Sequence, residues 1–397
     1  KINKQNIKAE LKWTLHIIFQ NQNYKKFFDQ LPANLDFIIS NNITNKNVSL
    51  ENINKSQIIL DGSRNLEFAG KKIVDELANT IPNDNQSIIS EIPNSRIVSN
   101  NKYIFKKNDI IFPSGDYKIL KDLIIPDNFN LVIDAGVKLL LSPNVNILLK
   151  GGSLNIKGTK SHPVIIDQLI PGKNWGAISV LSSNKISNLS YSKIVNGGSN
   201  IKFLAQGVYY TGQLNFFHSN VNIDNSLISY SKAEDALNIK KSSFNIDNVE
   251  FSFNKYDAFD GDWVNGEITN SLVRNNGNDG LDFSGSKIVI KNTIFEKMRD
   301  KSLSIGEQSK LDIINCRFAN SNYAIAVKDL SKVRIFGSSI YNNNFGVAVY
   351  RKKPIFGSGV VTVSGGLVWD NLRNFVTDEN AKIILNNTGL NKDIISN

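Results

Sequence analysis

The sequence DAFDGD at residues 257–262 is followed 22 residues later by DGLDFS at residues 279–284, and this step of 22 recurs through the middle of the chain. The same spacing of 22 residues separates the members of a series of apolar residues, which we call a column: Leu237, Phe259, Leu281, Leu303, Ile325 and Val347. Polar or small residues alternate with these apolar ones, which is the pattern of a strand with one buried face. Two more apolar columns follow, so each repeat predicts three short strands. Such a repeat is typical of a three-sided parallel β-solenoid.

One asparagine per repeat stands between the second and the third predicted strand. The five residues are Asn225, Asn248, Asn270, Asn292 and Asn315. Stacked asparagine amides at a tight corner can hydrogen-bond to the turns above and below, which satisfies the polar groups of the corner. We therefore expect a buried asparagine ladder along one corner of the solenoid.

The chain of 397 residues, 41% of them apolar, is long enough to form a large core, to which every turn of a solenoid adds. No run of 18 apolar residues is present, so no membrane-spanning helix is expected. The net charge of +10 is spread along the chain without interleaved aromatic residues, which argues against a nucleic-acid partner. The single cysteine, Cys316, falls in a column of small residues and is expected to be buried.

The first 110 residues lack the 22-residue repeat. Their short apolar runs and one amphipathic segment, Gly70–Ile81, predict a small mixed α/β region, which is either a cap on the solenoid or the end of a larger domain. The solenoid pattern occupies residues 111–397 and leaves room for about 12 turns. The chain opens at Lys1 with polar residues, so we expect a processed product whose export signal is no longer present.

Several segments resemble the opening turns of bacterial right-handed parallel β-helix proteins. They are Gly136-Val137-Lys138, Gly158-Thr159, residues 163–166, Trp175-Gly176, Ser190-Tyr191 and residues 196–198. The acidic repeats between Glu234 and Pro354 are similar to exported β-helix regions of proteins that also carry a spore-coat-H-type kinase domain. This resemblance implies an all-β, right-handed parallel β-helix, located outside the bacterial cell or on its surface. It leaves the chemistry open.

Carboxylates recur on the first predicted strand of the central repeats. We expect Asp260, Asp262 and Asp282 to point outward, because they alternate with the apolar columns. A second column expected to point outward contains only small residues: Ala236, Ala258, Gly280, Ser302, Ala324 and Gly346. Together these columns would form a flat acidic trough along the solenoid, wide enough for an extended polymer.

Repulsion between stacked carboxylates has to be relieved by a proton, a lysine, water or a cation. For Asp260, Asp262 and Asp282, calcium binding is one interpretation and plain solvation is another. The aspartates stacked where the chain turns into this strand are instead expected to accept backbone N–H bonds. These are Asp235, Asp257 and Asp279.

A polysaccharide or cell-surface glycan is the partner that this trough suits best. Its hydroxyl groups would contact Asp260, Asp262, Asp282 and Lys328, and the ring of Trp263 would stack on a sugar. A packed turn is an equally good interpretation of Trp263. The sequence leaves the oligomeric state open.

A catalytic role is the alternative. Residues 278–282, with the sequence NDGLD, resemble the Asn-x-Asp-Gly-x-Asp strand of pectin-cleaving β-helix hydrolases, and Asp300 falls on the next turn. Lys301 replaces the second aspartate of that turn, and the Gly-His-Gly element of that family is absent, as is the Asp-Pro-His motif of alginate epimerases. A lyase with a lysine or arginine base would draw on Asp260, Asp282, Arg299 and Lys301.

The sequence therefore predicts an exported, non-catalytic protein that binds glycan or serves as a cell-surface scaffold. The alternative function is that of a polysaccharide lyase, hydrolase or epimerase acting in the acidic trough. A third hypothesis, a trimeric tailspike-like adhesin, is less favoured because residues 375–397 are short and polar for a trimerising segment.

Overall fold

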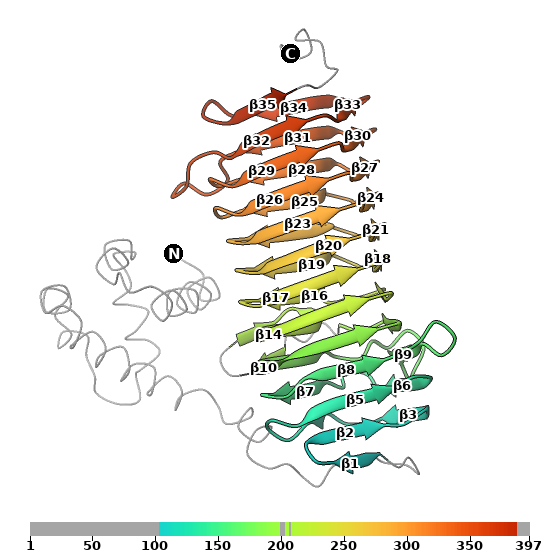
Figure 1. Ribbon diagram of the computed structural model, residues 1–397. Helices are drawn as coiled ribbons and strands as arrows, with labels where there is room; N and C mark the ends of the chain where they lie inside the picture. The colour runs from blue at the N-terminus through green and yellow to red at the C-terminus, as the bar shows by residue number, and fades with distance from the viewer. Residues whose placement is uncertain (1–102, 199–202, 206–207, 387–397) are drawn as a thin grey trace, which may run out of the picture. The chain divides into compact units, whose positions relative to one another are not determined.

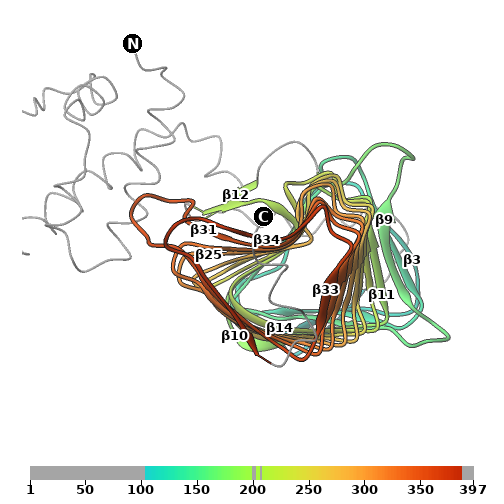
Figure 2. The ribbon, with the colours of Figure 1, turned by 90° about the horizontal axis from the view of Figure 1, so that it is seen from above.

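The computed structural model describes residues 103–198, 203–205 and 208–386. In these ranges the regular secondary structure consists of β-strands. They wind into a right-handed parallel β-helix in which successive turns stack their strands on three faces (Figures 1 and 2). The region predicted as a small α/β domain, residues 1–110, lies outside the described ranges except for its last eight residues, 103–110. Within these ranges, no helix is long and apolar enough to cross a membrane.

The first face carries the strands on which the acidic repeats lie. Its members are β4 (Leu123–Ile124), β7 (Ile147–Lys150), β10 (Ile178–Ser190), β14 (Gly212–Asp224), β16 (Asp235–Lys240), β19 (Asp257–Asp262), β22 (Leu281–Ser284), β25 (Lys301–Gly306), β28 (Tyr323–Lys328), β31 (Phe345–Tyr350) and β34 (Arg373–Thr377). The long strands β10 and β14 continue around the corner onto the second face.

The second face holds twelve parallel strands, one from each of twelve turns, as the sequence predicted. They are β2 (Asp109–Phe112), β5 (Asn130–Asp134), β8 (Leu154–Lys157), the second halves of β10 and β14, β17 (Ser243–Asp247), β20 (Asn265–Thr269), β23 (Lys287–Lys291), β26 (Lys310–Ile314), β29 (Lys332–Phe336), β32 (Val360–Ser364) and β35 (Lys382–Asn386).

The third face is a separate sheet of shorter strands. It contains β3 (Gly115–Ile119), β6 (Val137–Leu141), β9 (Val164–Gln168), β11 (Ser192–Val195), β15 (Leu227–Ser229), β18 (Glu250–Ser252), β21 (Leu272–Arg274), β24 (Ile294–Glu296), β27 (Arg317–Ala319), β30 (Ser339–Tyr341) and β33 (Leu367–Trp369). Three strands pair outside the parallel stack. β1 (Ile104–Lys106) is antiparallel to β2, and β12 (Phe203–Ala205) forms a hairpin with β13 (Val208–Tyr210).

The predicted apolar column forms the centre of the core. Leu237, Phe259, Leu281, Leu303 and Ile325 are each fully buried, and each pairs with the residue 22 positions further along the chain. Every turn buries its apolar side chains away from water, and this burial is the main contribution to the stability of the stacked turns. Cys316 is buried as expected, at 3% exposure.

The column of small residues does not point outward as predicted. Ala236, Ala258 and Ala324 are fully buried within the apolar core, directly next to inward residues such as Leu237. The chain turns a corner here, so two successive side chains face the interior and the alternation begins only after them. A side chain at Gly280 would meet the Ser302 backbone at 2.5 Å. The prediction of a flat trough bordered by small residues is therefore wrong.

The five predicted ladder asparagines occupy the corner between the second and third faces, but this corner is open to water. All five have φ between 48° and 52°, a left-handed conformation that asparagine tolerates better than most residues. Three amide bonds join neighbouring turns, from Asn248 to Asn225, from Asn292 to Asn270 and from Asn315 to Asn292. The Asn270 amide instead donates to Asp247, which interrupts the column. The expected burial is wrong, because the sharp corner turns these side chains outward.

A buried polar column lies instead at the corner between the third and first faces. Asn254 Nδ2 donates to Asn276 Oδ1 at 2.9 Å, and further along Asn343 Nδ2 donates to Asn371 Oδ1 at 2.9 Å. The same asparagine oxygens also accept the backbone N–H of the preceding turn. Met298 and Ser321 occupy the intervening turns, which is why the column is hard to recognise in the sequence.

Candidate functional site

Charged side chains gather on the outer side of β16, β19, β22 and β25, a surface that we call the acidic face. Strand pairing places its residues in three columns along the axis. The first column is Asp235, Asp257, Asp279 and Lys301; the second is Asn238, Asp260, Asp282 and Ser304; the third is Lys240, Asp262 and Ser284.

The first column sits where the chain enters each strand. Asp257 Oδ1 accepts the backbone N–H of Asp279 at 2.8 Å, and Asp279 Oδ1 accepts the N–H of Lys301 at 3.0 Å. These two bonds confirm the turn role predicted for Asp257 and Asp279. Asp235 differs, because its Oδ2 accepts from the side chains of Thr211 at 2.5 Å and Asn238 at 3.0 Å.

These carboxyl groups are difficult to ionise. Burial raises the pKa of Asp235 to about 7, and it raises the pKa of Asp257 to about 7 with a further contribution from Asp279. Burial also raises the pKa of Asp279, although the Lys301 ammonium, 3.3 Å from Oδ1, opposes the rise. Burial lowers the pKa of Lys301, but Asp279 and Asp300 outweigh it and hold the pKa above its ordinary value.

The neighbouring columns contain a second charge cluster, centred on Lys240. Its Nζ lies 2.8 Å from Asp262 Oδ2 and 3.9 Å from Asp260 Oδ2. Asp260 also accepts from Asn238 Nδ2 at 2.8 Å. Burial and the nearby Asp235 raise the pKa of Asp260 well above its usual range. Asp260 and Asp262 therefore already share a positive partner.

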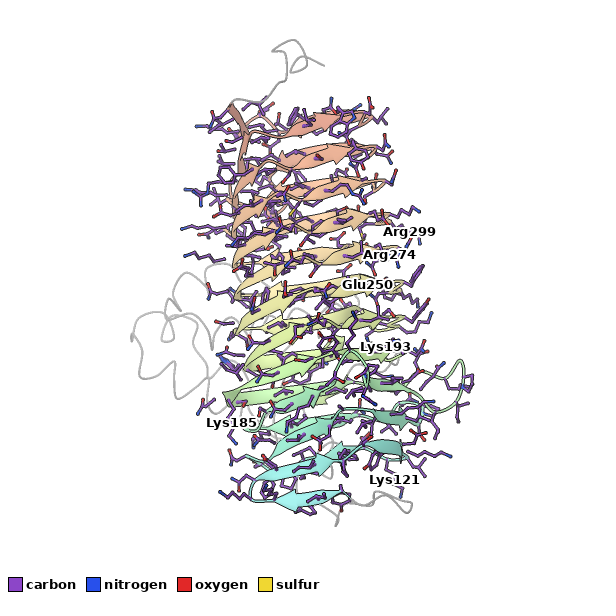
Figure 3. All side chains as sticks on the ribbon, turned by 45° about the vertical axis from the view of Figure 1, so that its right-hand side comes forward. Lys121, Lys185, Lys193, Glu250, Arg274 and Arg299 are labelled. Carbon is purple, nitrogen blue, oxygen red and sulfur yellow. The ribbon has the colours of Figure 1, made fainter. Side chains whose placement is uncertain are left out.

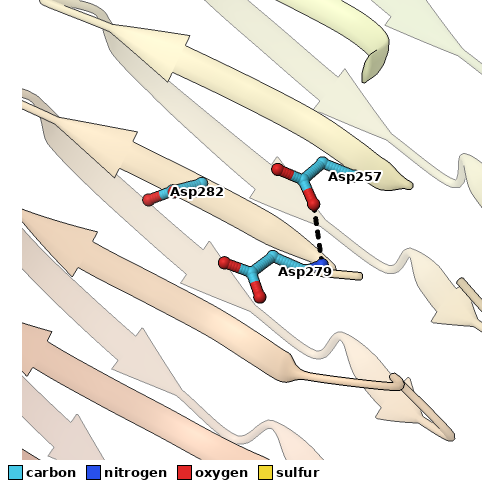
Figure 4. A group of neighbouring side chains, drawn as sticks. All are labelled: Asp257, Asp279 and Asp282. Carbon is cyan, nitrogen blue, oxygen red and sulfur yellow. Dashed lines mark hydrogen bonds between the residues drawn. The ribbon is translucent and has the colours of Figure 1, made fainter. Parts of the chain in front are cut away.

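Asp257, Asp279 and Asp282 form the group that resembles a cation site. Each offers one carboxylate oxygen, and the three oxygens lie within 4.8 Å of one another. Figure 4 shows the side chains on two adjacent strands, with the bond from Asp279 N to Asp257 between them. The calcium site predicted from the sequence consisted of Asp282 together with Asp260 and Asp262. In the structure Asp260 and Asp262 contact Lys240.

The other predicted site residues are dispersed. Lys328 is only 4% exposed and donates to Ser304 Oγ at 2.6 Å, so it presents no free ammonium to solvent. Trp263 lies at the corner after β19, where it is 48% exposed and 6.0 Å from the Lys241 ammonium. Arg299 is exposed at the corner before β25 and lines a different cleft.

An aromatic pair continues the first column beyond Lys301. Tyr323 and Phe345 occupy the same register on β28 and β31, and their rings stack with centroids 4.4 Å apart at 15°. Both residues are half-buried. The sequence analysis missed this pair, although the step of 22 residues that links Asp257 to Asp279 leads directly to it.

The family described as the right handed beta helix region matches residues 206–388 of the chain. The described residues have the fold of a β-helix repeat protein. A comparison with curated protein sequences found no match.

Solved structures of similar fold include the A-module of the mannuronan C-5 epimerase AlgE4 from Azotobacter vinelandii. It is 11% identical with a TM-score of 0.51, over 70% of this β-helix protein and 86% of that module. The Dettilon tailspike protein gp208 is 10% identical with a TM-score of 0.47, over 69% and 61% of the two chains. Pectate lyase Pel9A is 12% identical with a TM-score of 0.38, over 68% and 79%. At such identities the likeness is one of fold.

Proposed function

We propose that this β-helix protein is exported and that its acidic face binds a polysaccharide without cleaving it. The observation that carries the proposal is the first column, in which the half-buried Asp257 and Lys301 are followed by the stacked rings of Tyr323 and Phe345. Carboxylates and an ammonium suit the hydroxyl groups of a sugar, and aromatic rings suit its apolar side. Because the column repeats at the ~4.8 Å spacing of strands, it favours an extended chain over a compact ligand.

The charges of the acidic face favour binding over turnover. A lysine base needs a lowered pKa, whereas two carboxylates raise the pKa of Lys301. Arg299, the other candidate base, belongs to the preceding corner. The AlgE4 module, named as a mannuronan C-5 epimerase, supports a polysaccharide ligand by analogy of fold only.

A carbohydrate-processing enzyme is the second candidate function. A single observation favours it: the pKa of Asp257 is raised to about 7, in the range of an efficient general acid or base at neutral pH. Asp282 lies on the adjacent strand with a carboxylate oxygen within 4.8 Å of one from Asp257. The two functions share one surface and differ in whether the glycan is altered.

A glycan array followed by mass analysis of the incubated glycans separates these functions. Binding to a polysaccharide whose mass and linkage stay unchanged supports the proposal, whereas new products support the enzyme. The variant Asp282→Asn/Tyr323→Ala should lose the bound glycan. The matched control Lys118→Gln, an exposed lysine on β3 of the third face, should keep it. If both variants retain the glycan equally, the acidic face is not the binding surface.

Calcium is the cation that we propose for Asp257, Asp279 and Asp282. Three convergent carboxylate oxygens suit a hard cation. A cation would also relieve the repulsion from Asp279, which adds to the effect of burial in raising the pKa of Asp257. Millimolar calcium should then raise the melting temperature through mass action. Asp282→Asn should abolish this rise, while Asp262→Asn, whose carboxylate pairs with Lys240, should retain it. A rise lost in Asp262→Asn but kept in Asp282→Asn would instead favour the ligand set predicted from sequence.

A further inference from the structure

A shallow, open cleft of about 570 Å³ lies at the corner between the third and first faces, apart from the acidic face. Gly277, which has no side chain, lines it, and the equivalent residues of the adjacent turns are Lys255 and Arg299. All three bond through their backbone N–H to the preceding turn in the same way. A side chain at Gly277 would meet the Lys255 carbonyl oxygen at 2.0 Å, so the gap between these cations is built into the backbone.

One wall of the cleft is an exposed aromatic stack. Tyr230 and Phe253 are 47% and 45% exposed, and their rings lie parallel, at 7°, with centroids 5.4 Å apart. Both residues have positive φ, 55° and 58°, which is costly for bulky side chains. The Arg274 guanidinium lies 6.0 Å from the centre of the Phe253 ring and pairs with Glu250 at 2.9 Å.

The cations of the cleft are not neutralised. Lys255, Lys297 and Arg299 are all exposed, and among the described residues none of them forms an ion pair with a carboxylate. The lining also contains no acidic residue. Arg274 and Arg299 project from the same edge of the solenoid (Figure 3). The cleft therefore presents positive charge to the solvent.

The floor of the cleft is hydrogen-bonded from turn to turn. It consists of the buried column of Asn254, Asn276 and Met298, in which each residue bonds to the next turn. Such a floor holds the aromatic wall and the cations at fixed spacing, so little ordering is required when a ligand binds.

We propose that this cleft binds an anionic saccharide, with its charged groups on Lys255, Lys297 and Arg299 and one sugar ring against Tyr230 and Phe253. Charge complementarity selects the anion, and the exposed ring pair selects a sugar over a free inorganic anion. Carboxylated and sulfated sugars share this chemistry. The site is independent of the acidic face, whose carboxylates would repel the same ligand.

Calorimetric titration with four probes tests the proposal. They are a heparin-derived hexasaccharide, a hexasaccharide of galacturonate, neutral maltohexaose and a thymidine oligonucleotide. At least one anionic hexasaccharide should bind more tightly than the neutral one, and its binding should weaken as salt screens the exposed charges. The tighter of the two identifies the charged group as carboxylate or sulfate. Equal binding of the neutral sugar, or tighter binding of the oligonucleotide than of both anionic sugars, overturns the proposal.

Variants locate the binding. Lys297→Gln/Arg299→Gln should weaken the anionic hexasaccharide about tenfold. Phe253→Asn, which keeps a residue that tolerates positive φ, should weaken it as well. The control Lys118→Gln/Lys138→Gln removes two exposed lysines from the first turns and should bind as the wild type does. Asp282→Asn/Tyr323→Ala should also bind normally, so failure of the acidic face and failure of the cleft remain distinguishable. Unchanged binding by Lys297→Gln/Arg299→Gln contradicts the site.

Discussion

The acidic face lies next to the corner that holds the cleft, and the two surfaces use charge in opposite ways. On the acidic face each lysine has carboxylate partners, as Lys301 has with Asp279 and Lys240 with Asp262. In the cleft, Lys255 and Arg299 remain in water with no such partner among the described residues. The lysines of the acidic face are therefore held by carboxylate partners, and the charges in the cleft are available to a ligand.

Residues only two positions apart should differ most in their effect on stability. Lys301→Gln leaves Asp279, whose side chain is 5% exposed, without its ammonium and should lower the free energy of unfolding by about 2–3 kcal/mol. Arg299→Gln removes an exposed, unpaired charge and should change it by less than ~0.5 kcal/mol. Urea unfolding at neutral pH measures both. Equal losses in the two variants would remove the distinction between the surfaces.

The acidic face should also make stability depend on pH. The pKa of Asp235 rises from 3.8 to about 7 on folding, so the native state binds the proton more tightly than the unfolded chain. This contribution is fully present below pH 4 and is lost as the pH rises through 7. Without added calcium, the contribution of Asp235 to the free energy of unfolding should fall by on the order of 2 kcal/mol between pH 5 and pH 7.

The matched variants for this pH dependence again come from the two surfaces. Asp235→Asn should reduce the fall in stability, because the amide does not titrate in this range. A part of the fall should remain, because the pKa of Asp257 is also raised to about 7. Lys297→Gln in the cleft should leave the slope as it is in the wild type. A slope in Asp235→Asn as steep as that of the wild type would assign the whole titration to other carboxylates of the acidic face.

The smallest expected effects compare the floor of the cleft with the exposed asparagine corner. Asn276→Gly leaves the backbone N–H of buried Asn254 without its acceptor and should cost about 1–2 kcal/mol. Asn270→Gly, at a water-exposed position with φ of 50°, should be close to neutral because glycine suits that conformation. Melting temperatures of the two variants check the difference. A large drop in the melting temperature of Asn270→Gly would mean that the side-chain amides stabilise the exposed corner.

Much of the fold was predictable from the sequence because a solenoid repeats one local rule. The step of 22 residues identified the strands, their register and the column from Leu237 to Val347, since a buried strand face has to repeat in every turn. The acidic residues of the first face were found for the same reason. Asp260 and Asp282 do pair on adjacent strands.

The orientation of side chains at the corners was not predictable, because the two-residue period of a strand does not extend through a corner. Ala236 was expected outward and lies in the core, since two successive residues turn inward at that point. Asn248 and Asn254 are only six residues apart, yet the first is exposed and the second is buried and bonded to Asn276. Whether a corner is buried depends on how the two faces meet there. The sequence pattern of regularly spaced asparagines is the same for a buried corner and an exposed one.

The sequence by itself determined the β-helix, its turns and the residues of its core, because hydrophobic burial acts on a period that can be read along the chain. Only the tertiary structure decided which charges are paired. Lys301 is neutralised by Asp279, one turn away, whereas Arg299, two residues earlier, faces the gap left by Gly277. Electrostatic partners are set by distances of a few ångströms between turns, and the physical reason is that Coulomb energy and burial depend on position in space rather than on order in the chain.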